Sequence, residues 1–182
     1  MMPGGIEHAR RHPAACAAWL TSTLGPDGIT VSVAHHDAAL TVFDVRLDAP
    51  PPKDLPGYPA EQVRVNVGRT GEVWAVPVRG DERAWCHRYP YLTTQQIVSQ
   101  PRQRLTWIGI TGPLCLEYPR DPPHLRWHWT ERLHTYMRIV QRHLWSEEYW
   151  RRHGAWPVED APHGDAADGT IHLIRTLELR SA

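Results

Sequence analysis

Cysteine is scarce in this sequence, and its spacing does not suggest cross-linking. Only Cys16, Cys86 and Cys115 occur among the 182 residues, an odd number without a Cys-x-x-Cys pair. Disulfide frameworks and structural zinc sites need closely and regularly spaced cysteines. The sequence therefore predicts neither of them, and it indicates a reducing compartment.

The chain also lacks an excess of charge of either sign. Its 20 Lys and Arg residues balance 20 Asp and Glu residues, and Lys53 is the single lysine. No basic field favours nucleic acid, and no acidic excess indicates a solvating tail. Long apolar runs are missing as well, because no segment approaches the roughly twenty apolar residues of a membrane-spanning helix. We expect a soluble, cytoplasmic protein without nucleic-acid or membrane partners.

The length predicts a single domain over residues 1–182, with a core at about 5–165 and a C-terminal extension at 166–182. Apolar residues at helical spacing predict a first helix from Ile6 to Leu24, kinked at Pro13. Alternating β-branched residues then predict a four-stranded antiparallel meander, with strands at 29–36, 39–47, 62–67 and 72–78. The proline-rich stretch between the second and third strands predicts an extended loop.

The strongest helical pattern runs from Thr130 to Gly154. Thr130 is expected to cap its start, and Gly154 is expected to end it. The apolar stripe of this helix consists of Leu133, Met137, Val140 and Leu144, widened by Tyr136 and Ile139. Residues 170–180 are typical of a final strand or a short helix.

One cysteine has an unusual setting. Cys115 follows a Gly-Pro turn and precedes the irregular sequence Leu-Glu-Tyr-Pro, whereas Cys16 lies on the alanine face of the first helix. A thiol attacks only as the thiolate, which requires partial exposure and a polar neighbourhood. From the residues alone, both a reactive thiol and a buried structural cysteine stay open for Cys115.

The order of these features resembles the ubiquitin-conjugating (E2) fold, an α+β fold with an N-terminal helix, a four-stranded meander, an active-site loop and a long C-terminal helix. The family places its cysteine in a Gly-x-(Ile/Leu)-Cys-Leu frame, matched here by the sequence from Gly112 to Leu116, and then a tryptophan before a helix, matched by Trp127 or Trp129. The segment HLWSEEYWRRHGAWPVEDAPHG, at 143–164, is similar to the ending of bacterial E2-like proteins. Those proteins occur in conjugation operons with ubiquitin-like, E1-like and JAB-peptidase genes, some of them antiphage.

The resemblance implies a transferase with a cysteine thioester mechanism. Cys115 would accept a ubiquitin-like protein from an E1-like activating enzyme and pass it to a target protein, without a cofactor or a metal. The first helix would help to dock the E1-like partner, through Arg10 and Arg11 or with these arginines as plain surface charge.

The sequence departs from the eukaryotic pattern near the cysteine. The family's His-Pro-Asn element is missing, because the single asparagine, Asn66, lies in a strand pattern far upstream. Two histidines are candidates for its role: His87, before Cys115, and His163, after it, where a histidine stands in bacterial relatives. An imidazole N–H can donate a hydrogen bond to an oxyanion as an amide can.

Two other functions remain open. A cysteine hydrolase would combine Cys115 with His163 and Asp160 or Asp165, although the sequence shows no strand-Cys-helix elbow. A catalytically silent E2-like module would only bind a ubiquitin-like partner, and the Leu-Cys-Leu frame argues against it. Most of the twelve histidines, His143 among them, are expected to lie on the surface or to serve in packing.

Overall fold

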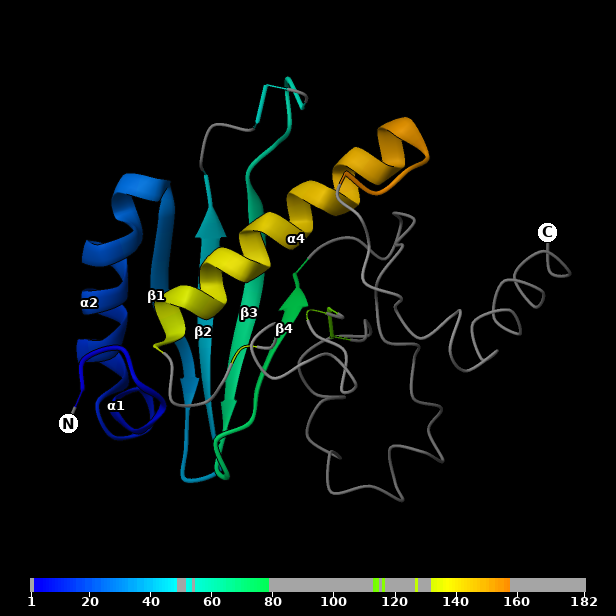
Figure 1. Ribbon diagram of the computed structural model, residues 1–182. Helices are drawn as coiled ribbons and strands as arrows, with labels where there is room; N and C mark the ends of the chain where they lie inside the picture. Colours follow the sequence, from blue (N-terminus) through cyan, green and yellow to red (C-terminus); the bar gives the residue numbers. More distant parts are fainter. Residues whose placement is uncertain are drawn as a thin grey trace, which may run out of the picture.

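The computed structural model describes residues 2–48, 52–53, 55–78, 113–114, 116, 127 and 132–157. Over these residues the chain is α+β: two short helices precede a four-stranded antiparallel sheet, and a long helix follows it (Figure 1). The prediction of an α+β class with these elements is confirmed. The predicted C-terminal extension and the element expected at 170–180 lie outside the described residues.

The predicted first helix is split in two at Pro13. Helix α1 (Ile6–Arg11) and helix α2 (Pro13–Leu24) meet at His12, which has φ −137° and ψ 61°. Proline has no N–H to donate into the preceding turn, and its ring disfavours a helical conformation for the residue before it. The kink that the sequence predicts is therefore a full break. A short 3₁₀ turn, η1 (Gly25–Asp27), ends this part of the chain.

The sheet is a meander whose strands pair in chain order. It consists of β1 (Ile29–His36), β2 (Leu40–Leu47), β3 (Glu61–Gly68) and β4 (Val73–Pro77), which confirms the predicted strands to within about a residue at each end. Asp37 shapes the turn between β1 and β2, since its Oδ1 accepts the backbone N–H groups of Ala39 and Leu40 at 2.7 and 2.8 Å. This is the local bonding that favours aspartate in turns.

Helix α2 protects the outer edge of β1. The Thr21 hydroxyl lies 2.9 Å from the backbone nitrogen of Val31 and 3.0 Å from its carbonyl oxygen, so it satisfies both groups. Further along β1 the pairing with β2 shifts between Val33 and His35. A covered edge and a bulge both discourage pairing with another chain.

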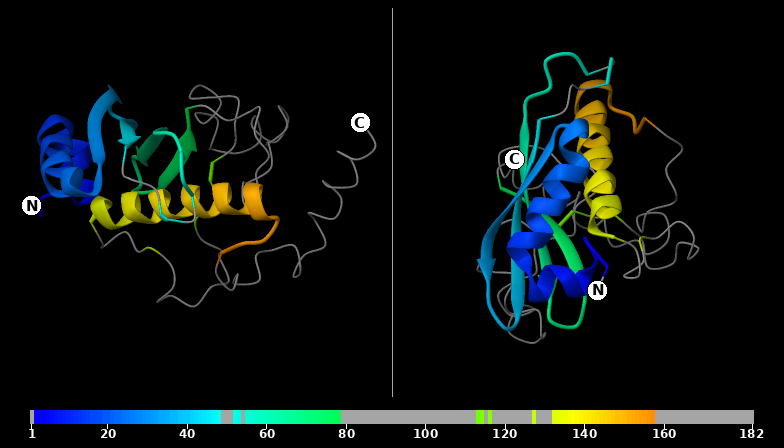
Figure 2. Two further views of the ribbon diagram at one scale, coloured as in Figure 1. Left: turned by 90° about the horizontal axis from the view of Figure 1, so that it is seen from above. Right: turned by 90° about the vertical axis from the view of Figure 1, so that its left-hand side faces the viewer.

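The hydrophobic core lies between the sheet and the helices. Helix α4 (Leu133–His153) crosses one face of the sheet diagonally, while α2 lies beside β1 and α1 contacts β2 and β3 (Figures 1 and 2). Alternate residues of each strand face these helices, as the two-residue period predicts. The fully buried members include Ile29, Phe43, Val45, Val63, Val65, Ala75, Leu20, Leu24, Leu133 and Met137.

The predicted stripe of α4 is confirmed except for Ile139, which is only partly buried, and the predicted cap is wrong. The helix begins after Arg132 rather than Thr130, and no side chain caps it. The backbone N–H of Leu133 instead donates to the carbonyl of Gly4 at 2.7 Å, so the N-terminal segment satisfies one of the free donors of the first turn. Gly154 ends the helix with φ 72°, as expected. Within the described residues, no helix is both long and apolar enough to cross a membrane.

Candidate active site

The residue before the predicted nucleophile is fixed to the free edge of β4. The backbone N–H of Leu114 donates to the carbonyl of Ala75 at 2.9 Å. The backbone N–H of Val78 donates to Gln62 of β3. In an antiparallel pair, every second residue bonds to the same neighbouring strand, so Val76 and Trp74 also face β3. Ala75, between them, directs its N–H and C=O away from β3. The sheet thus offers a bonding position to the segment that contains Cys115.

Side-chain packing holds the same segment from both sides. Leu114 is 3% exposed and belongs to the hydrophobic core, and Leu116 is partly buried against that core. Removing apolar side chains from water contributes about 25 cal/mol for each Å² buried. The two leucines of the Leu-Cys-Leu frame are therefore anchors, one on each side of Cys115.

A tryptophan connects the sequence after this frame to α4. Trp127 is partly buried against the core, and its ring meets Tyr136 edge-on, with the centroids 5.1 Å apart. Edge-to-face contacts between aromatic rings are favourable beyond the area that they bury. Of the two tryptophans predicted to precede the helix, Trp127 makes this contact, and Trp129 lies outside the described residues.

The three predicted catalytic residues, Cys115, His87 and His163, lie outside the described residues. Cys86 lies there too, as do Asp160 and Asp165, the acids of the hydrolase alternative. Their roles stay predictions. The structure describes the immediate neighbours of Cys115 and the elements to which those neighbours attach.

Cys16 has the environment expected of a structural thiol. It is fully buried in the core between α2 and the sheet, which confirms the prediction for this residue. Burial raises the pKa of its thiol to about 11, against a smaller lowering by a backbone hydrogen bond from Gly4. A thiol with this pKa is almost never a thiolate at neutral pH, so Cys16 is unsuited to nucleophilic chemistry.

His143 is also a packing residue, as predicted. It is buried on α4, with its ring 5.6 Å from that of Trp156 and its Nε2 3.5 Å from Oε1 of Glu147 one turn later. Glu147 is fully buried, which the sequence analysis did not anticipate. Its position one heptad after Val140, on the apolar stripe, was the available signal.

Comparisons with known proteins leave the family open. No protein-family model matches the chain, and a search of curated proteins finds no match either. Among the described residues, no group of three or more His, Cys, Asp or Glu side chains is arranged to hold a metal ion.

Proposed function

We propose that this protein is an E2-like conjugating enzyme that carries a ubiquitin-like protein as a thioester on Cys115. The observation that supports this most is the attachment of the Gly-Pro-Leu-Cys-Leu frame: Leu114 is bonded to the edge of β4, and Leu114 and Leu116 both pack on the core. In the chain these anchors follow two helices and a four-stranded meander and precede a long helix, which is the order that the resemblance implies.

The alternation of side chains gives the proposal its geometry. In an extended segment, successive side chains point to opposite sides. With Leu114 and Leu116 both on the core, the residue between them is expected to face away from it. A nucleophilic thiol needs this exposure, because burial in apolar surroundings raises a thiol pKa, as it does for Cys16.

The proposed chemistry consists of two acyl transfers. The Cys115 thiolate attacks the thioester carbonyl that joins the ubiquitin-like protein to the E1-like enzyme, a carbon–sulfur bond forms, and the E1 cysteine leaves as a thiolate. An amine or another nucleophile of the target then attacks the new thioester, loses its proton to a base, and displaces the Cys115 thiolate. Each step passes through an oxyanion, to which His163 or His87 would donate an imidazole N–H.

The test is a charging assay with purified components. The protein is mixed with an E1-like enzyme, a ubiquitin-like protein and ATP, and the products are run on gels with and without reductant. We expect a reductant-sensitive adduct in the native protein, none in Cys115→Ala, and a reductant-resistant oxyester in Cys115→Ser. Cys16→Ala and Cys86→Ala serve as matched controls and should charge normally. An adduct that survives in Cys115→Ala would refute the proposal.

The histidines are tested by timing charging and discharge separately. Loss of one oxyanion donor costs about 2.7–4 kcal/mol, or roughly 10²–10³ in rate. His163→Ala and His87→Ala are therefore expected to differ, with the true donor slowing discharge to an amine by about that factor. If both variants discharge at the native rate, neither histidine has this role. Hydrolysis of a small thioester or peptide by the protein alone would instead indicate the cysteine hydrolase.

A further inference from the structure

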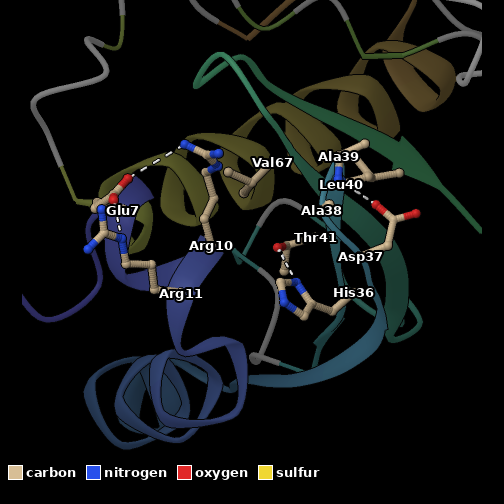
Figure 3. Close-up of a pocket in the computed structure, with 10 residues that line it drawn as sticks. All are labelled: Glu7, Arg10, Arg11, His36, Asp37, Ala38, Ala39, Leu40, Thr41 and Val67. Carbon is tan, nitrogen blue, oxygen red and sulfur yellow. Dashed lines mark hydrogen bonds and ion pairs between the residues drawn. The ribbon is translucent and has the colours of Figure 1, made fainter.

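A hollow of about 310 Å³ opens between α1 and the hairpin of β1 and β2 (Figure 3). Pockets for small ligands usually begin near this size. Its wall combines two arginines and a histidine with two acids, and it shares no residue with the frame around Cys115. The residues concerned are Glu7, Arg10 and Arg11 of α1, His36 to Thr41 of the hairpin, and Val67 of β3.

Pro13 determines which ring nitrogen of His36 carries the hydrogen when the ring is neutral. Because Pro13 has no N–H, the carbonyl of Ala9 lacks its helical donor, and the buried Thr41 hydroxyl donates to it at 3.4 Å. A hydroxyl has one hydrogen to give. In the 3.0 Å contact between Thr41 Oγ1 and His36 Nδ1, the ring is therefore the donor. A neutral His36 then carries its lone pair on Nε2.

The two arginines share a single carboxylate. Glu7 lies 3.5 Å from Nη1 of Arg10 and also pairs with Arg11 (Figure 3). One negative charge between two guanidinium groups leaves a net positive charge. A guanidinium has five N–H donors, and this long contact with Glu7 engages only one nitrogen of Arg10.

The second acid of the wall, Asp37, is already satisfied by its own turn. Its carboxylate accepts the N–H groups of Ala39 and Leu40 and points toward them, away from Arg10 (Figure 3). The bond from Ala39 contributes most to holding the Asp37 pKa at about 2, followed by those from His35 and Leu40. Asp37 therefore stays ionised, and the ion pair of Arg10 is with Glu7 instead.

We propose that this hollow binds a phosphate group. Arg10 contacts the charged oxygens, and the lone pair of His36 Nε2 accepts the remaining proton of a hydrogen phosphate. Inorganic phosphate keeps at least one proton throughout the neutral range, whereas a phosphate monoester, with a second pKa near 6, has lost its last proton in most molecules at pH 7. Carboxylate and sulfate are fully deprotonated there and offer no hydrogen to Nε2. The site is therefore expected to prefer inorganic phosphate to sulfate and carboxylate.

The first experiment titrates inorganic phosphate into the full chain at pH 7 and constant ionic strength, followed by amide NMR shifts. We expect saturable shifts around Arg10, His36 and Thr41, and sulfate binding about tenfold weaker, the value of one strong hydrogen bond. Arg10→Ala should weaken phosphate binding by about tenfold or more. The matched control is Arg46→Ala, which removes an exposed arginine, paired with Asp48, at the other end of β2.

Two more variants test the assigned roles. Glu7→Gln frees Arg10 from its carboxylate and should tighten phosphate binding, whereas a structural role alone would not predict a gain. His36→Ala should remove the preference for phosphate over sulfate. The absence of a saturable response, or equal affinity in Arg10→Ala and the native protein, would overturn the proposal. Cys115→Ala should bind phosphate normally, so this site and the thioester proposal succeed or fail independently.

A phosphoserine peptide, compared with its unphosphorylated form, distinguishes the source of the phosphate. Tighter binding than inorganic phosphate indicates a phosphate carried on a protein. Binding equal to or weaker than that of inorganic phosphate indicates a free small phosphate. Either result requires the same loss in Arg10→Ala to support the site.

Discussion

Two cysteines of this chain carry the same thiol, and we propose that their settings are opposite. Cys16 is enclosed by the core, and its pKa is raised to about 11. Cys115 stands between Leu114 and Leu116, both of which pack on the core, and is proposed to face away from it. Composition does not distinguish the two residues, so the proposed difference depends on the side of the local backbone to which each thiol points.

This difference predicts a labelling order. At pH 8, a thiol with a pKa of about 11 is ionised in roughly one molecule in a thousand, and it is also shielded from reagent. In the folded protein, iodoacetamide should leave Cys16 unmodified while Cys115 reacts, with the sites read by peptide mass spectrometry. In guanidinium chloride all three cysteines should react. Labelling of Cys16 at the rate of Cys115 in the folded protein would contradict the burial argument.

At the scale of elements, two helices end at glycines in different conformations. Gly25, after α2, has right-handed helical angles, with φ −54°, whereas Gly154, after α4, is left-handed, with φ 72°. No atom lies within 4 Å of a Cβ built on either residue. Backbone conformation is therefore the main difference between the two positions.

Alanine at these two glycines should change stability in opposite directions. Gly25→Ala reduces the freedom of the unfolded chain at a compatible conformation and should stabilise by about 0.4–1 kcal/mol. Gly154→Ala forces a side chain into the left-handed region and should cost about 1–2 kcal/mol. Urea denaturation followed by circular dichroism measures both changes. Equal effects of the same sign would show that φ does not decide the outcome.

At the scale of the whole molecule, Leu114 and Leu116, the neighbours of Cys115, are attached to the folded core. Leu114 comes from the chain between β4 and α4, yet it lies in the same cluster as residues of α2, the sheet and α4. It also extends the hydrogen bonding of β4 through Ala75. The folding of the sheet and the placement of the proposed site are therefore coupled.

Shortening this anchor should destabilise the entire protein. Leu114 is 3% exposed, and Leu→Ala substitutions at buried positions cost about 2–5 kcal/mol. Leu114→Ala should lower the denaturation midpoint while tryptophan fluorescence and circular dichroism still report one transition. Met2→Ala is the control, since Met2 is 54% exposed and should have almost no effect. An unchanged midpoint for Leu114→Ala would show that the anchor does not contribute to the fold.

The sequence by itself determined the regular elements. Alternation fixed the four strands, the stripe of Leu133, Met137, Val140 and Leu144 fixed α4, and Pro13 marked the break between α1 and α2. These features follow from neighbouring residues, because periodicity states which side of an element is buried. The frame around Cys115 was likewise visible as a motif, while the roles of Cys115, His87 and His163 stay predictions.

Only the tertiary structure decided which distant groups satisfy one another. The carbonyl of Gly4 serves the start of α4 where Thr130 was expected, and Thr41 supplies the hydrogen bond that Pro13 denies to Ala9. The hollow beside α1 likewise depends on how α1 packs against the hairpin of β1 and β2. A free donor or acceptor can be read from the chain, but its partner is chosen by packing, because any polar group brought within reach can satisfy it.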